Sequence, residues 1–222
     1  MDILKKIKRY ISSNKNIHIA NKNFSYLGRD IIHLFFDNYK YAAPISLLGK
    51  IYNILRLYKP TFIIEFGSGV STVLMAKNTA PPTTIISFDE NLEYMQKYIP
   101  YFKNNKNVIY LHIQKKNGTD YQHLQNDISF KKPADFLIID GPSGERFGND
   151  TKKFYDLIIN QDTLCIIDDI DRDIINIEAQ KIADKYQLQK MDYSDPLYEH
   201  HKYSILFPKR FHHSMLPKDI II

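Results

Sequence analysis

Hydrophobic and polar positions follow two different periods along this chain, and the change falls near Pro60. Before Pro60, apolar residues recur every three or four positions in three segments, which predicts three helices. These helices cover residues 3–11, 30–39 and 44–58, with Pro44 at the first helical position of the third. The first carries basic residues between its apolar positions. We expect a docked helix with a solvated basic face, and a helix that binds a membrane surface or a polyanion is the alternative.

After Pro60 the chain contains short runs rich in β-branched and aromatic residues, each followed by a segment that can be helical. This order predicts βαβ units and a parallel sheet, and the apolar character of the runs is typical of strands covered by helices on both faces. The last two runs, 188–193 and 202–207, are joined by a polar loop too short for a crossover helix, so we expect them to pair antiparallel. The five earlier runs are 61–66, 83–89, 107–113, 134–140 and 163–168.

The predicted fold class is therefore α/β, a Rossmann-like, doubly wound and mostly parallel sheet with additional N-terminal helices. The 222 residues, 44% of them hydrophobic, fit one sizeable domain. No apolar run is long enough for a membrane span and no signal-like leader opens the chain, so we expect a cytoplasmic protein. Cys165, the single cysteine, lies in an apolar run and is expected to be buried and inert. The net charge of +5 is weak evidence for an anionic partner, and no nucleic acid is expected.

The first predicted strand leads into a glycine-containing turn, in the segment "FIIEFGSGVST" at residues 62–72. Gly67 and Gly69 allow a tight turn and a close approach of the backbone to a ligand, while Ser71 and Thr72 can cap the following helix. In an open α/β sheet, ligands bind at the carboxyl ends of the strands. A nucleotide-like cofactor is therefore expected at this turn.

The residues around the turn discriminate between cofactors. No lysine ends the glycine loop, which argues against a P-loop, and Thr72 stands where a dinucleotide fingerprint has its third glycine. Glu65 would repel a pyrophosphate and favours a cationic cofactor such as S-adenosylmethionine. Asp89 ends the next strand, 24 positions after Glu65, where its carboxylate can bind both ribose hydroxyls. The alternative is a tight turn with solvated acids and no cofactor.

These segments resemble the successive motifs of class I S-adenosylmethionine-dependent methyltransferases. The matching stretches are "FIIEFGSGVSTVLMA", "ISFDEN", "ADFLIIDGPSGERFG" and "CIIDDIDR". They are most similar to a bacterial group with Glu-Phe-Gly-Ser-Gly-x-Ser-Thr and Ile-Asp-Gly-Pro-x-Gly signatures. The resemblance implies a seven-stranded sheet with a reversed final strand. It also implies that the cofactor contacts Glu65, Gly67, Ser68, Gly69, Ser71, Thr72 and Asp89.

The resemblance also divides the chain. Residues 1–43 form a helical extension, residues 44–208 the methyltransferase domain and residues 209–222 a C-terminal tail. The tail ends in an apolar run, which is expected to pack on the body of the protein or on a partner subunit of a homo-oligomer. Tyr41 and Ser46 are candidates for the border of the cofactor pocket, since the preceding helix usually covers it.

Carboxylates at the ends of the fourth and fifth strand runs are candidates for chemistry. Asp140 ends "FLIID", and Asp168 and Asp169 end "CIIDD" 28 positions later. Neighbouring strand ends can bring the three carboxylates together, and clustered oxygens suit a hard cation such as Mg²⁺. The alternative is that one acid caps the next helix and the other pairs with Arg146 or Arg172.

Methyl transfer to oxygen also requires a proton acceptor. In small catechol-type relatives a lysine follows the first metal-binding aspartate by three positions and serves as the base, whereas Ser143 stands there in this chain. The role would fall to Asp140, Asp169 or a histidine. The candidate histidines are His200 and His201, in the predicted loop between the last two strands.

The combined expectation is an S-adenosylmethionine-dependent methyltransferase that methylates a hydroxyl group of a small acceptor. A sugar or glycan precursor is the favoured acceptor class, since the similar bacterial group is often associated with polysaccharide modification. No Asn/Asp-Pro-Pro-aromatic motif follows the fourth strand, which argues against methylation of a base amine. The alternatives are an NAD-dependent oxidoreductase and a non-catalytic binding module on the same sheet.

Overall fold

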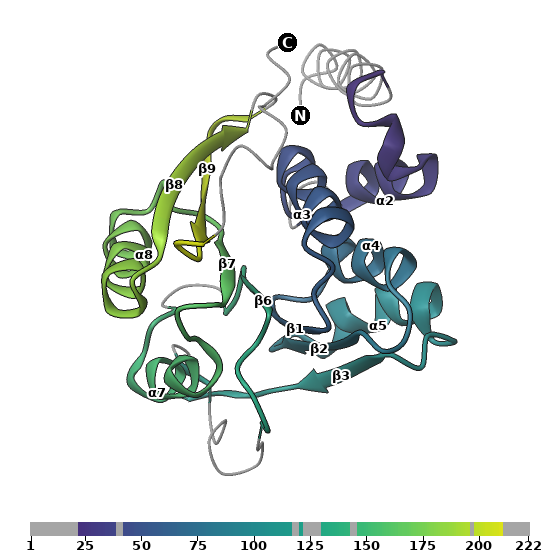
Figure 1. Ribbon diagram of the computed structural model, residues 1–222. Helices are drawn as coiled ribbons and strands as arrows, with labels where there is room; N and C mark the ends of the chain where they lie inside the picture. The colour runs from purple at the N-terminus through teal and green to yellow at the C-terminus, as the bar shows by residue number, and fades with distance from the viewer. Residues whose placement is uncertain are drawn as a thin grey trace, which may run out of the picture.

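A seven-stranded sheet forms the centre of the protein, with the strand order β3-β2-β1-β6-β7-β9-β8 (Figure 1). The computed structural model describes residues 22–38, 42–116, 120–121, 130–142, 146–195 and 198–210. The predicted basic helix at 3–11 and residues 211–222 of the predicted C-terminal tail lie outside these residues. The strands of the sheet are β1 (Phe62–Phe66), β2 (Thr84–Asp89), β3 (Val108–His112), β6 (Phe136–Ile139), β7 (Leu164–Ile167), β8 (Gln189–Asp195) and β9 (Tyr198–Phe207).

Strands β3, β2, β1, β6 and β7 are parallel, and β9 pairs antiparallel with both β7 and β8. This arrangement confirms the predicted fold class and the reversed final strand. The strand order runs outward in both directions from β1 and β6, so the carboxyl ends of these two central strands lie at the point where the order reverses. That point is where open α/β sheets bind their ligands.

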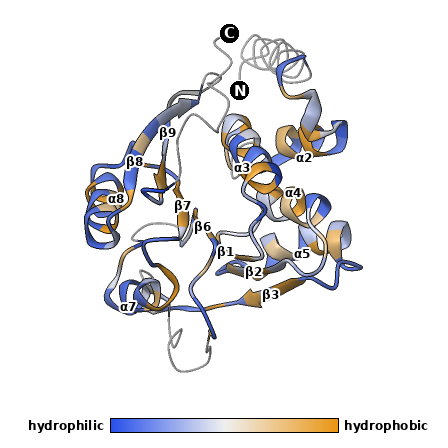
Figure 2. Ribbon diagram, in the orientation of Figure 1, coloured by the Kyte–Doolittle hydropathy of each residue, from blue (hydrophilic) through white to orange (hydrophobic). Residues whose placement is uncertain are grey.

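The sheet separates two hydrophobic layers, because alternate residues of each strand point to opposite faces. On one face, Ile63 of β1 packs with residues of α2 (Arg29–Asn38), α3 (Ile45–Leu57), α4 (Val70–Asn78) and α5 (Leu92–Phe102). On the other face, Ile64 packs with residues of α7 (Asn149–Ile158) and α8 (Asp173–Tyr186). Hydrophobic segments accordingly face the sheet from both sides (Figure 2). The central strands β1, β6 and β7 are covered on both faces, which explains why their side chains are almost all apolar.

Helices α3 and α4 begin within a few residues of the positions that the sequence predicts. Pro44 is the N-cap residue of α3 and not its first helical residue. Helix α4 begins at Val70, directly after Gly69, so Ser71 and Thr72 belong to its first turn. In α2, Ile32 and Phe35 are fully buried in the same core as β1. The predicted boundary at residue 43 therefore crosses one continuous core, and it stays a prediction.

The C-terminal hairpin differs from the sequence-based expectation. The predicted polar loop between residues 193 and 202 is mostly strand, because β8 continues to Asp195 and β9 already begins at Tyr198. Polar side chains are tolerated there because β8 lies at the edge of the sheet, where pairing needs only the backbone. His201 consequently lies within β9 and not in a loop. No described helix has the length and apolar content needed to cross a bilayer.

Candidate functional site

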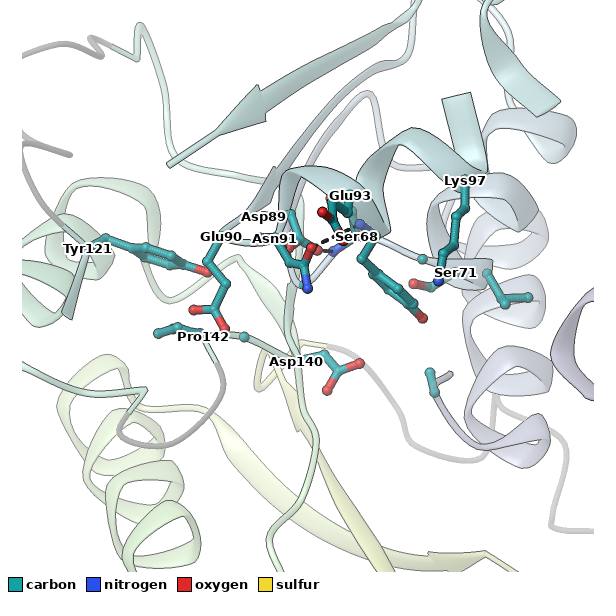
Figure 3. Close-up of a pocket in the computed structure, with 16 residues that line it drawn as sticks. Ser68, Ser71, Asp89, Glu90, Asn91, Glu93, Lys97, Tyr121, Asp140 and Pro142 are labelled. Carbon is teal, nitrogen blue, oxygen red and sulfur yellow. Dashed lines mark hydrogen bonds between the residues drawn. The ribbon is translucent and has the colours of Figure 1, made fainter. Parts of the chain in front are cut away.

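A cavity of about 430 Å³ opens at the carboxyl ends of β1, β2 and β6 (Figure 3). This volume lies within the range of small-molecule sites, about 300–1,000 Å³. Three loops supply most of the lining: the turn after β1, the start of α5 after β2, and the segment after β6. The lining residues named in Figure 3 are Ser68, Ser71, Asp89, Glu90, Asn91, Glu93, Lys97, Tyr121, Asp140 and Pro142.

Gly67 holds the turn after β1 against the segment after β6. Its φ of +93° lies in the region that residues with a side chain rarely adopt. A Cβ atom on Gly67 would lie 2.8 Å from the carbonyl carbon of Asp140. Gly69 differs, since a Cβ atom there would meet only Tyr94, with the hydroxyl oxygen at 3.6 Å. A glycine is therefore required at position 67 by the backbone conformation and the close approach of Asp140, whereas Gly69 leaves space next to the cavity.

Glu65 lies beneath this turn and is completely buried. Its carboxylate accepts hydrogen bonds from the hydroxyl groups of Ser71 (2.5 Å), Thr72 (2.5 Å) and Ser87 (2.6 Å). Thr72 in turn accepts a hydrogen bond from the backbone N–H of Gly69 at 2.9 Å, which caps the start of α4. Burial raises the pKa of Glu65 to about 7. Glu65 and Thr72 are not among the residues that line the cavity, whereas Ser71, which bonds to Glu65, is one of them.

The titration of Glu65 predicts a pH dependence of stability. The pKa of Glu65 is about 7 in the folded protein and 4.5 in the reference state, so the folded protein binds the proton of this carboxyl group more tightly than the unfolded chain does. The stabilisation is complete below pH 4.5 and is lost as the pH rises through 7. The stability of the wild type relative to Glu65→Gln should therefore fall between pH 5 and 8, by up to about 1.4 kcal/mol per pH unit. Urea unfolding at both pH values measures this difference.

The control for this prediction is Glu93→Gln, which removes an exposed carboxylate from α5. That variant should keep the pH dependence of the wild type. Identical pH profiles for the wild type and Glu65→Gln would show that Glu65 does not titrate in this range.

Asp89 ends β2 and is one of the residues that line the cavity. Its two carboxylate oxygens accept hydrogen bonds from the backbone N–H groups of Ser68 (2.8 Å) and Asn91 (2.7 Å). The residue is 6% exposed, and burial raises its pKa. Each carboxylate oxygen can accept further hydrogen bonds, so Asp89 is oriented by the backbone and can still bind the hydroxyl groups of a ligand.

Several lining residues were not identified from the sequence. Asn91 caps α5 by accepting a hydrogen bond from the N–H of Tyr94 at 2.9 Å, and the Tyr94 hydroxyl accepts one from Tyr98 at 2.8 Å. The sequence feature that could have identified them is the start of the helix that follows Asp89. Of the two residues expected to border the pocket, Tyr41 lies outside the described part of the chain. Ser46 is not a lining residue, and its hydroxyl donates to Asp195 at 2.6 Å.

The three aspartates after β6 and β7 do form one cluster, but only Asp140 lines the cavity. In Figure 3, Asp140 lies across the cavity from Asp89 and Ser68. Burial and the neighbouring charge of Asp168 raise the pKa of Asp140. Asp169, the other aspartate named as a candidate base, is not among the lining residues. Asp169 is instead held in ion pairs by Arg146 and Arg172, at 2.5 and 3.0 Å, which is the alternative use that the sequence left open.

Asp168 is bound by a histidine of β9. Nε2 of His201 lies 2.8 Å from Oδ1 of Asp168, and Nδ1 lies 3.9 Å from Oδ1 of Asp169. Burial lowers the pKa of His201, but the hydrogen bond and the charge of Asp168 outweigh it, so the pKa is raised. The backbone of His200, the other candidate base, belongs to β9, but its side chain lies outside the described residues.

The cluster does not fit the predicted Mg²⁺ site well. Asp168, Asp169 and His201 each offer a ligand atom within 4.8 Å of the others. However, Asp140 and Asp169 already share the guanidinium group of Arg146, and Asp168 holds His201. A magnesium ion needs several oxygen ligands at about 2.0–2.1 Å, and here cationic side chains contact those oxygens.

The sequence matches no family model and no curated protein sequence. The fold, however, is similar to that of solved methyltransferases. The O-methyltransferase from Bacillus cereus, solved in complex with SAH, aligns at 13% identity and a TM-score of 0.58 over 88% of this chain and 90% of that one. A methyltransferase from Geobacter sulfurreducens aligns at 9% identity and a TM-score of 0.56, over 82% and 89%.

A third similar structure is TomG from Streptomyces achromogenes, an O-methyltransferase involved in tomaymycin synthesis and solved in complex with SAM. It aligns at 10% identity and a TM-score of 0.54, over 75% of this chain and 82% of that one. At such identities the similarity shows the fold alone. The chain therefore has the Rossmann-like fold that these methyltransferases share, with its cavity at the carboxyl ends of the central strands.

Proposed function

We propose that this protein is an S-adenosylmethionine-dependent methyltransferase that acts in the cytoplasm on a hydroxyl group of a small acceptor, with a sugar or glycan precursor as the favoured class. One observation carries the proposal. The cavity at the switch point of the sheet is bounded on one side by the glycine turn with the buried carboxylate of Asp89, and on the other by the carboxylate of Asp140. A cofactor site and a proton acceptor thus share one cavity.

The cofactor side fits S-adenosylmethionine by the chemistry of its donors and acceptors. Asp89, oriented by two backbone N–H groups, is suited to bind the two ribose hydroxyls. The turn from Gly67 to Ser71 offers backbone at close range because Gly69 leaves space on the cavity side. Glu65 keeps the turn in place through Ser71 and Thr72. With a pKa of about 7 it can ionise when a cationic ligand binds nearby, which favours such a ligand over a pyrophosphate.

The acceptor side has one carboxylate in position for proton transfer. When bound, S-adenosylmethionine supplies a methyl group made electrophilic by the positively charged sulfur. Asp140 takes the proton of the acceptor hydroxyl on a carboxylate oxygen, so that the oxygen can bond to carbon without becoming a charged oxonium. Asp169 shares the Arg146 guanidinium group with Asp140, and His201 is hydrogen-bonded to Asp168; both are proposed to act on Asp140 indirectly, through this cluster. His200 stays a candidate for contact with the acceptor.

The alternative functions have less support from the site. A dinucleotide would place its pyrophosphate at a turn that has Thr72 in place of the third glycine and Glu65 directly beneath it. A binding module without a cofactor would not need Asp89 to be buried and oriented by two amides. The apolar tail is compatible with a homo-oligomer, and the proposed partner of the site itself is a small molecule.

Calorimetric titration with S-adenosylhomocysteine tests the cofactor assignment. Asp89→Asn removes the charge but keeps the shape, and a hydrogen bond to a charged group contributes about 1.5–3 kcal/mol. We therefore expect the Kd to rise about tenfold or more. Asp184→Asn, which removes an exposed carboxylate from the far side of α8, should bind like the wild type. Equal affinity of the wild type and a folded Asp89→Asn variant would remove Asp89 from the cofactor site.

A further inference from the structure

Arg146 bridges two of the carboxylates that follow β6 and β7, whereas the sequence left open only a pair with one of them. Its Nη2 atom lies 3.3 Å from Oδ1 of Asp140 and 2.5 Å from Oδ2 of Asp169. Its Nη1 atom donates to the backbone oxygens of Asp168 at 2.9 Å and Ile139 at 3.3 Å. The side chain is 3% exposed. One buried guanidinium group therefore binds the ends of both strands and bridges two carboxylates.

Charge explains why a cation is needed at this position. Asp140, Asp168 and Asp169 follow neighbouring parallel strands, and three carboxylates at one sheet edge repel one another strongly when they are removed from water. A divalent cation is one way to neutralise such a cluster, and a planar guanidinium is another because it can bridge carboxylate oxygens with fixed geometry. In this chain the bridging position between Asp140 and Asp169 is occupied by Nη2 of Arg146.

Asp168 and Asp169 each have one carboxylate oxygen already bound by another side chain. Oδ2 of Asp169 is shared by Arg146 and Arg172, and Oδ1 of Asp168 is bound by His201. Asp169 adopts a φ of 59°, a conformation that few residues with a side chain adopt, and this places its carboxylate against both arginines. An ion held by Asp168, Asp169 and His201 would compete with these contacts and would lie next to the charges of two arginines.

We propose that Arg146 takes the place of a divalent cation in this cluster, so that the site works without a bound metal ion and Arg146 acts as a positioning residue for Asp140. Only the role of Asp140 as proton acceptor rests on the proposed function. The claim that Arg146 excludes a metal ion is independent of it and can be tested without knowing the acceptor.

The test is a titration with Mn²⁺, followed by electron paramagnetic resonance of the free ion. The wild type is expected to bind no Mn²⁺ up to about millimolar concentration. Arg146→Gln removes the charge and keeps a group that can bond to the backbone oxygens, so it should bind one Mn²⁺ at least about tenfold more tightly than the wild type. Arg172→Gln is the matched control, because it removes the same charge from the exposed partner of Asp169 and should behave like the wild type.

Each outcome decides the proposal. One Mn²⁺ bound by the wild type overturns it, and so does the absence of binding by both the wild type and a folded Arg146→Gln variant. If Arg146→Gln unfolds, Mn²⁺ should restore its circular dichroism, since the ion would fill the same place, and failure to do so counts against the proposal. Titration of the wild type with S-adenosylhomocysteine reports separately on the cofactor, so failure of one claim does not imply failure of the other.

Discussion

Replacement of Gly67 by alanine is expected to abolish measurable binding of S-adenosylhomocysteine and to destabilise the protein. The new Cβ atom would lie 2.8 Å from the carbonyl carbon and 2.9 Å from the carbonyl oxygen of Asp140, both of them backbone atoms that cannot move alone. The backbone φ of +93° adds a strain of about 1–3 kcal/mol for any residue with a side chain. The two loops must therefore separate, and they carry both sides of the cavity.

Gly69→Ala is the matched control for this prediction. Its Cβ atom would make only an ordinary contact with Tyr94, and the φ of 179° is extended backbone that any residue adopts. Urea unfolding should show a clear loss of stability for Gly67→Ala and little change for Gly69→Ala. Equal stability of the two variants, or calorimetric affinity of Gly67→Ala at the level of the wild type, would contradict the assigned role of this close approach.

The second large effect is expected for Asp140→Asn. Asparagine keeps the shape of the side chain but cannot accept the acceptor proton, so turnover should fall by roughly a hundredfold or more while the affinity for S-adenosylhomocysteine changes little. Turnover is measured with an acceptor found by screening hydroxylated sugars for methyl transfer. Asp135→Asn is the control from the opposite end of the same strand, where Asp135 binds Thr61 and Phe62. It should affect stability more than turnover, and normal turnover by Asp140→Asn would exclude Asp140 as the base.

The central sheet could be predicted because its strands are buried on both faces. The centres of these runs, such as 62–64 and 136–139, contain no polar residue, which is typical of parallel strands covered on both faces. The position of Asp89 could be predicted for a related reason, since a carboxylate at the end of an apolar strand must lie where the carboxyl ends of the strands meet. The spacing of Gly67 from Glu65 likewise indicated the turn. These features depend on local sequence and on the rule that open α/β sheets bind their ligands at the carboxyl ends of the strands.

The side of the candidate site that contains Asp140, proposed for the acceptor, could not be predicted in the same way. The sequence places Asp140, Asp168 and Asp169 at neighbouring strand ends, but it does not show which carboxylate faces the cavity. That depends on Arg146, which follows Asp140 by six positions and folds back beneath it. The position of His201 depends on the register of the β8–β9 hairpin, whose polar residues between 193 and 202 look like a loop in the sequence. Side chains that meet through tertiary contacts leave no periodic signal.

Crystals grown with S-adenosylhomocysteine give the most direct test of the central claim, that this cavity is the cofactor site of a methyltransferase. The account predicts that the ligand lies between the glycine turn and Asp140, with its ribose hydroxyls within hydrogen-bonding distance of the Asp89 carboxylate and its sulfur on the side of Asp140. A ligand bound elsewhere, or a ribose that does not contact Asp89, would contradict it.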